Sequence, residues 1–186
     1  MPDVFDRRGF LVGAAATGLA LAGAAAGGTA LSDAAREAPE ALADATGGPT
    51  PAEWARFSAS LTGYAVRRGQ PAYGTDRLLY NPKFDGLAPL GIAYCASTED
   101  VVRALAFARS HSCPVAVRAG GHSYGGYSSG TGRVVVDVTS LRGVVPAAAP
   151  GGTARVGAGA RLIDVYNTLG RAGQLVPAGS CPTVGF

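Results

Sequence analysis

Residues 91–138 decide the fold and read GIAYCASTEDVVRALAFARSHSCPVAVRAGGHSYGGYSSGTGRVVVDV. The first six residues, 91–96, form an apolar run that predicts a strand. Ser97 or Thr98 then offers a helix cap, and the predicted helix ends near His111. Its apolar face is expected to contain Val101, Ala104, Leu105 and Ala108. The stretch therefore opens with a strand and a helix of ordinary length.

Two more apolar runs continue this alternation. Residues 114–120 predict a second strand and residues 133–138 a third, with a glycine-rich segment between them. Upstream, residues 50–53 have the Thr-Pro-Ala-Glu pattern of a capping box, which begins a helix with Trp54, Phe57 and Leu61 on one face. Residues 63–69 predict a short strand before the stretch, and Tyr80, Asn81 and Pro82 are expected to stop a helix.

The pattern continues downstream of the quoted stretch. Residues 143–149 and 153–159 flank a Pro-Gly-Gly turn and predict a hairpin. A helix follows, with Leu162, Val165, Tyr166 and Leu169 on one face, and it closes at Gly170 or Gly173. The order of elements predicts an α+β fold with α/β alternation, in which small mixed sheets are flanked by helices.

The N-terminal residues have the pattern of an export signal. Arg7 and Arg8 precede an uncharged run of small and apolar residues at 10–26. The sequence Arg-Arg-Gly-Phe-Leu resembles a twin-arginine signal, although a short retained membrane anchor is an alternative. Cleavage after Ala26 or after Ala45 is compatible with the small residues there. We therefore expect residues 1–45 to be a signal and linker, the twin-arginine machinery to be a partner, and the protein to be exported without a stable membrane anchor.

Composition excludes several other classes. The 186 residues carry a net charge of +3, and no basic stripe with interleaved aromatic residues is present, so nucleic acid is not an expected partner. Cys95, Cys113 and Cys181 are an odd number of widely spaced cysteines, which is neither a zinc pattern nor a disulfide framework. Cys95 and Cys113 are expected in the core, and whether they pair in an exported protein stays open.

The glycine-rich segment RAGGHSYGGYSSGTG, residues 118–132, follows directly on the second of these strands. Such a turn presents backbone N–H groups with few side chains in the way, which suits phosphate oxygens, and Arg118 adds a charge for a diphosphate. It is not a Rossmann fingerprint, because no helix opens from its glycines. From the residues alone, a surface loop with an incidental His122 remains an equal alternative, while a metal site lacks ligand spacing.

A family resemblance decides between these alternatives. Residues 84–141 resemble the flavin-binding domain of the p-cresol methylhydroxylase/vanillyl-alcohol oxidase superfamily, often called PCMH-type. Together with GSCPTVG at 179–185, the glycine segment resembles the berberine-bridge-enzyme-like branch. The resemblance implies that His122 bonds to the 8-methyl carbon of FAD and that Cys181 bonds to ring carbon C6. A buried, small apolar role beside Pro182 is the alternative for Cys181.

The resemblance also implies an activity. We expect an FAD-linked oxidase in which hydride passes from an alcohol, sugar or amine to flavin N5 and O2 reoxidises the flavin. A flavin dehydrogenase with another acceptor and an inactive truncated exported module are the alternatives. Residues 50–186 are expected to form a PCMH-type FAD-binding domain that is incomplete at its C-terminal end, so no catalytic base is assigned.

The predicted cofactor-binding residues fall in the two motifs. They are His122, Cys181, Arg118, Gly120, Gly121, Ser123, Tyr124, Gly179, Ser180 and Gly185. Tyr80, Tyr94 and Tyr166 are expected to serve packing, and Asp137 to cap a turn or to contact a functional group. No metal is expected.

Overall fold

The computed structural model describes residues 48–186, so the predicted signal and linker at 1–45 lie outside the described residues. In chain order the elements are α2 (Pro51–Ser60), β1 (Tyr64–Arg67), α3 (Tyr73–Asp76), the 3-10 turn η2 (Pro82–Phe84), β2 (Gly91–Tyr94), α4 (Thr98–Ser110), β3 (Val115–Arg118), β4 (Val134–Asp137), β5 (Val144–Val145), β6 (Arg155–Val156) and α5 (Leu162–Arg171). Among these residues no helix is both long and apolar enough to cross a bilayer.

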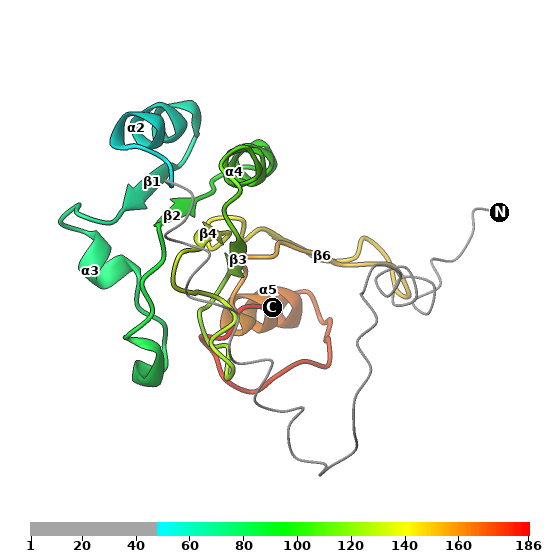
Figure 1. The fold of residues 1–186 in the computed structure, drawn as a ribbon. Helices are drawn as coiled ribbons and strands as arrows, with labels where there is room; N and C mark the ends of the chain where they lie inside the picture. The colour runs from blue at the N-terminus through cyan, green and yellow to red at the C-terminus, as the bar shows by residue number, and fades with distance from the viewer. Residues whose placement is uncertain (1–47) are drawn as a thin grey trace, which may run out of the picture. The chain divides into compact units, whose positions relative to one another are not determined.

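The main sheet has four strands in the order β1-β2-β4-β3. Strands β2 and β3 both pair in parallel with β4, whereas β1 pairs antiparallel with β2 at the edge. The connection from β2 through α4 to β3 therefore leaves a gap of one strand, which β4 fills (Figure 1). A mixed sheet flanked by helices confirms the expected α+β fold.

Strand β4 is the centre of the core because both of its faces are covered. Its valines at 134, 135 and 136 are completely buried. On one face, Val134 and Val136 pack against α2 and α4, which lie on the same side of the sheet in Figure 1. On the other face, Val135 packs with Tyr73 of α3. Continuous burial explains why β4 is an unbroken apolar run rather than an alternating one.

The first helix begins as the capping box predicts. The Thr50 hydroxyl accepts from the backbone N–H of Glu53 at 3.3 Å, and the Glu53 carboxylate accepts from the Thr50 backbone N–H at 2.7 Å. Trp54 and Phe57 are buried against α4, where the rings of Phe57 and Phe107 stack with centroids 4.2 Å apart. This contact fixes the two helices on one face of the sheet.

The predicted face of α4 is wrong in one position. Ala104 and Ala108 are fully buried as expected, but the Leu105 side chain is 43% exposed. The buried stripe begins instead at Asp100, four residues before Ala104. Asp100 is buried because its carboxylate accepts the backbone N–H groups of Thr62, Gly63 and Ala96, each at 2.9 Å. A polar side chain with its partners thus occupies a position that periodicity assigns to an apolar one.

The segment around Asn81 begins a helical turn and does not stop one. Helix α3 already ends at Asp76, and the Asn81 side chain accepts from the backbone N–H of Lys83 at 3.0 Å. Pro82 then occupies the first position of η2, where its missing N–H costs nothing. The expectation of a helix stop at this point is therefore wrong.

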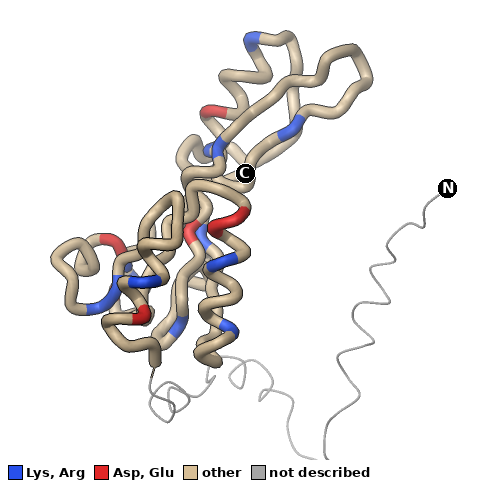
Figure 2. The backbone as a smooth tube through the Cα atoms, turned by 90° about the horizontal axis from the view of Figure 1, so that it is seen from above, with Lys and Arg blue, Asp and Glu red and all other residues tan. Residues whose placement is uncertain are grey.

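The last third of the described residues forms the predicted hairpin and helix. Strands β5 and β6 pair antiparallel, and Leu162, Val165 and Leu169 of α5 are buried. The helix continues through Gly170 and ends before Gly173, which adopts φ +68° in the left-handed region. Charged residues are spread over the elements, with both signs interspersed along the backbone (Figure 2).

Candidate functional site

The glycine loop after β3 exposes backbone donors. Gly121 has φ +71°, a conformation that glycine adopts readily, and its carbonyl accepts from the Tyr80 backbone N–H at 3.2 Å. Within residues 48–186, no acceptor lies in hydrogen-bond reach of the backbone N–H groups of residues 121–124. The loop therefore offers a row of donors at the carboxyl end of a parallel strand, a usual place for ligands in such sheets.

The segment that carries Cys181 is fastened to the start of α5. The carbonyls of Pro182 and Val184 accept the backbone N–H groups of Ile163 and Leu162 at 3.1 and 3.0 Å. These N–H groups belong to the first turn of the helix and have no partner within it. The helix terminus thus determines where the GSCPTVG motif lies.

The two segments meet backbone to backbone at a pair of glycines. A Cβ atom on Gly120 would lie 2.6 Å from the Gly185 nitrogen and 2.8 Å from the Thr183 carbonyl oxygen. A Cβ atom on Gly185 would lie 2.8 Å from the Cβ of Ala119. Glycine at both positions is therefore a packing requirement, and it brings the two motifs into contact.

A cavity of about 880 Å³ lies between these segments. All of the predicted cofactor-binding residues except Arg118 line it: Gly120, Gly121, His122, Ser123, Tyr124, Gly179, Ser180, Cys181 and Gly185. The volume falls in the usual range of sites for drug-sized ligands and cofactors. Side chains from two distant parts of the sequence therefore face one common space.

His122 and Cys181 converge on a single hydroxyl group. The Thr183 Oγ1 atom lies 2.9 Å from His122 Nε2 and 3.8 Å from Cys181 Sγ. His122 Nε2 and Cys181 Sγ therefore cannot be farther apart than these two distances taken together. One imidazole and one thiol thus face the same end of the cavity.

Tyr80 has a different role from the packing expected for it. Its side chain is 70% exposed, and its ring stacks on the His122 imidazole with centroids 4.0 Å apart. Sequence reasoning also missed Thr183, although this residue lies inside the quoted motif. The phenol of Tyr166 donates to the Gly179 carbonyl at 2.6 Å, so this tyrosine holds the cysteine segment.

Arg118 does not face the cavity. Its side chain is 7% exposed, and its Nε donates to an Asp137 carboxylate oxygen at 2.6 Å. The guanidinium also donates to the Asp76 carbonyl at 2.7 Å and to the Tyr94 hydroxyl at 3.2 Å. Asp137 in turn accepts from the Thr139 backbone N–H, so it both caps the next turn and pairs with the arginine. The geometry therefore does not support a diphosphate contact from Arg118.

Tyr94 packs beside this ion pair. Burial is the main cause that raises the pKa of Tyr94 to about 12, and the nearby Arg118 charge opposes the rise. Its ring also stacks on that of Tyr64, with centroids 4.7 Å apart. The expectation that Tyr94 serves packing agrees with these contacts.

Buried hydroxyl groups add donors to the cavity. The Oγ atoms of Ser128 and Ser129 are buried and have no hydrogen-bond partner within the described part of the chain. Ser128 lines the cavity, close in sequence to the free N–H groups of 121–124. A buried hydroxyl without a partner is costly, so a bound acceptor such as a phosphate oxygen would satisfy it. The donor set therefore fits the diphosphate of a dinucleotide cofactor such as FAD.

The other two cysteines lie away from this cavity. Both are free, and Cys95 is fully buried. Burial raises the pKa of Cys95 to about 11 and also raises that of Cys113, so neither is a ready nucleophile. Residues 48–186 contain no group of three His, Cys, Asp or Glu side chains that could hold a metal.

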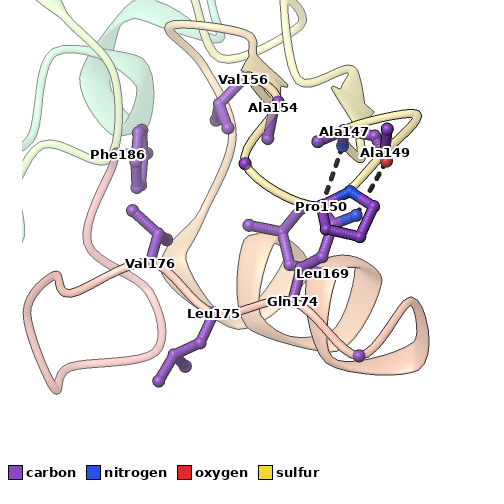
Figure 3. Close-up of a pocket in the computed structure, with 13 residues that line it drawn as sticks. Ala147, Ala149, Pro150, Ala154, Val156, Leu169, Gln174, Leu175, Val176 and Phe186 are labelled. Carbon is purple, nitrogen blue, oxygen red and sulfur yellow. Dashed lines mark hydrogen bonds between the residues drawn. The ribbon is translucent and has the colours of Figure 1, made fainter.

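A second cavity, of about 700 Å³, lies between the hairpin and α5. Leu169, Val176 and Phe186 are among its lining residues, and Gln174 hydrogen-bonds to the Ala147 backbone beside it (Figure 3). Its lining contains no titratable side chain. Of these two cavities, only the one lined by His122 and Cys181 has nucleophilic side chains in its lining.

Comparison with known proteins agrees with this site. A family profile described as FAD binding domain matches residues 89–186, which is more than half of the chain. The FAD-linked oxidoreductase YgaK of Bacillus subtilis (strain 168) is 32% identical over 126 residues, which are 68% of this chain and 28% of that protein. Berberine bridge enzyme-like D-1 of Nicotiana tabacum is 40% identical over 103 residues, 52% of this chain and 18% of its own length.

A solved structure has a similar fold over most of this chain. The wild-type BBE-like 1 protein of Physcomitrella patens has a TM-score of 0.65 and 34% identity, over 71% of this chain and 29% of that one. The chain thus spans less than a third of the length of each of these relatives. The matched profile, the PCMH-type fold and the convergence of both motifs on one cavity together lead to one conclusion: the chain belongs to the FAD binding domain family.

Proposed function

We propose that the chain carries FAD bound covalently to both His122 and Cys181. The protein would then oxidise a small alcohol, sugar or amine and transfer the electrons to O2. One observation carries this proposal: His122 Nε2 and Cys181 Sγ contact the same Thr183 hydroxyl, and both residues line the cavity. An imidazole ring and a thiol that share one hydroxyl contact can reach two carbons of a single flavin.

The lining of the cavity supports the proposed orientation of the cofactor. The N–H groups of residues 121–124 and the hydroxyl of Ser128 would hold the diphosphate, because these groups of the cavity have no partner among residues 48–186. His122 and Cys181 would hold the ring, which when bound accepts a hydride from the substrate. Two bonds to the protein would also prevent loss of the cofactor after export, where it is not replaced.

Denaturation tests the covalent attachment. Acid-precipitated and electrophoresed protein is read by flavin absorbance for wild type, His122→Ala, Cys181→Ala and the double variant. His111→Ala and Cys113→Ala are matched controls, because both residues lie outside the cavity. We expect the flavin to stay with the denatured wild type, both controls and each single variant, and to leave the double variant.

Two results would contradict the proposal. One is a colourless pellet after acid precipitation of the wild type. The other is a double variant that retains its flavin, since a different residue would then form the bond. For the oxidase assignment, reduced protein is exposed to air and peroxide is measured. Slow reoxidation without peroxide would favour a dehydrogenase with another acceptor.

We also propose that the protein is exported through the twin-arginine machinery. The support is the sequence of residues 7–11 and the uncharged run that follows. Replacing Arg7 and Arg8 with lysine retains the charge but removes the paired guanidinium groups. We expect cell fractionation to find the lysine variant in the cytoplasm and the unaltered protein outside it. Equal export of both would exclude this route.

A further inference from the structure

We infer that Thr183 is a positioning residue that prepares both His122 and Cys181 for attachment. This inference rests on the proposed covalent flavin and assigns a role to a residue that forms no bond to it. The Thr183 hydroxyl is the shared contact, at 2.9 Å from His122 Nε2 and 3.8 Å from Cys181 Sγ. Within residues 48–186 it has no other hydrogen-bond partner.

The hydroxyl has one proton, so it can donate to only one of its two contacts, and the directions of the two contacts are coupled. If Thr183 accepts from His122 Nε2–H, its own proton is free to point at the Cys181 sulfur. In the neutral imidazole the lone pair is then on Nδ1, which makes that nitrogen the nucleophile. The sulfur in turn receives a hydrogen-bond donor, which orients the thiol beside the imidazole. The opposite direction would leave the proton on Nδ1 and give the sulfur no donor.

The imidazole is also held on its face. Tyr80 stacks on it with ring planes 25° apart, and the Tyr80 backbone N–H donates to the Gly121 carbonyl. The ring is therefore fixed by the stack and by the hydrogen bond to Thr183. A loop with several glycines would otherwise allow the imidazole to turn, so the two contacts together replace the rigidity that the backbone lacks.

Each attachment is an oxidation that has the same balance. His122 exchanges its N–H, and Cys181 its S–H, for a bond to a ring-system carbon that loses a C–H. Two electrons and two protons therefore leave for each bond formed. Dioxygen accepts them and becomes hydrogen peroxide. Thr183 is unchanged by either step, and its role is limited to tautomer and orientation.

The test follows the rate of attachment when FAD is added to flavin-free protein. Thr183→Val and Thr183→Ser are each made in Cys181→Ala, which isolates the histidine bond, and in His122→Ala, which isolates the cysteine bond. Acid-stable flavin absorbance gives the rate in each background, and Thr153→Val in the exposed hairpin turn is the matched control. We expect valine to slow both attachments about tenfold, the size of one lost hydrogen bond, and serine to restore them.

The outcomes separate the two proposals. If neither background forms acid-stable flavin even with Thr183 intact, the covalent flavin itself is wrong. If both backgrounds form it and valine leaves both rates unchanged, the role of Thr183 is wrong. The proposed role of the shared hydroxyl would also be wrong if Thr183→Ser attached flavin as slowly as Thr183→Val. It would be wrong as well if Thr183→Val slowed attachment in only one of the two backgrounds. Thermal unfolding of each variant is measured beside the rates, so that a loss of fold is not read as a slow reaction.

Discussion

Replacing Arg118 with methionine is expected to destabilise the fold and to leave the cofactor site intact. The exposed fractions of the Arg118 and Asp137 side chains are 7% and 2%, and the two form an ion pair 2.6 Å long. Methionine retains the length and the apolar stem of the arginine but removes every donor. The Asp137 carboxylate is then left buried, with Thr139 as its remaining partner.

The magnitude follows from this burial. Removing one partner of a buried ion pair costs about 3–5 kcal/mol, because the other charge stays out of water. The Asp76 carbonyl and the Tyr94 hydroxyl also lose their contacts with the guanidinium. Adding Asp137→Asn to the methionine variant removes the stranded charge, and the Asn side-chain oxygen can still accept from Thr139. We expect the double variant to recover about 1–3 kcal/mol relative to the sum of the single changes.

Urea unfolding measures this cost. The chain has one tryptophan, Trp54, which is buried against α4 and reports the loss of the core by fluorescence. With a slope of about 2 kcal/mol per molar urea, the midpoint should fall by about 2 M for Arg118→Met. Below the transition, the fraction of protein that carries flavin should equal that of the wild type.

The reverse pattern would refute the reasoning. If the midpoint of Arg118→Met stays within about 0.3 M of the wild type, the ion pair contributes little to stability. If the flavin content falls while the midpoint does not move, the arginine serves the cofactor, as its position beside the glycine loop suggested from sequence alone. Single and double variants with additive effects would show that the two side chains are not coupled.

Three further predictions concern burial and close packing. Burial opposes ionisation of Asp100, but backbone N–H bonds hold its pKa below the ordinary value of 3.8. The ionised Asp100 therefore stabilises the fold fully near neutral pH, and this contribution is lost as the pH falls through the folded pKa. Asp100→Asn should lower the free energy of unfolding by about 2 kcal/mol at pH 7. In urea titrations at acid pH, the stabilities of the variant and the wild type should converge. Gly120→Ala should lose about 1–3 kcal/mol by thermal melting, whereas Gly74→Ala, with open space around it, should not, and equal losses would contradict the packing argument. In flavin-free protein a thiol reagent should modify exposed Cys181 rapidly and buried Cys95 only after unfolding. Equal modification rates for the two cysteines would show that the core is open to the reagent.

Local patterns were enough to predict most of the fold. The capping box at Thr50, the caps of α4 and the apolar run of β4 depend on neighbouring residues, and they lie where the sequence indicates. One error, at Asn81, was a misread local cap, and the other occurred where a tertiary partner overrides periodicity. Leu105 is exposed because Asp100 finds backbone donors on a loop far away in the sequence. No window of local sequence contains that information.

The site was predicted by motif and completed by the structure. The family resemblance predicted that His122 and Cys181 bind the same cofactor, and in the structure both residues line the same cavity. Three contributions could not be read from sequence: the Tyr80 stack, the bridging hydroxyl of Thr183 and the unpartnered hydroxyl of Ser128. The first two depend on contacts between segments far apart in the sequence, and the third depends on how the fold buries one hydroxyl.

The attachment of the cysteine segment to the first turn of α5 has a consequence for assembly. The pair of His122 and Thr183 is separated by 61 positions along the chain, so it closes a long loop that must form against chain entropy. That closure requires α5 to be folded, since the helix terminus supplies the anchoring N–H groups. A nascent or partly folded molecule thus contains both nucleophiles without bringing them together, and covalently bound flavin would show that this long-range contact has formed.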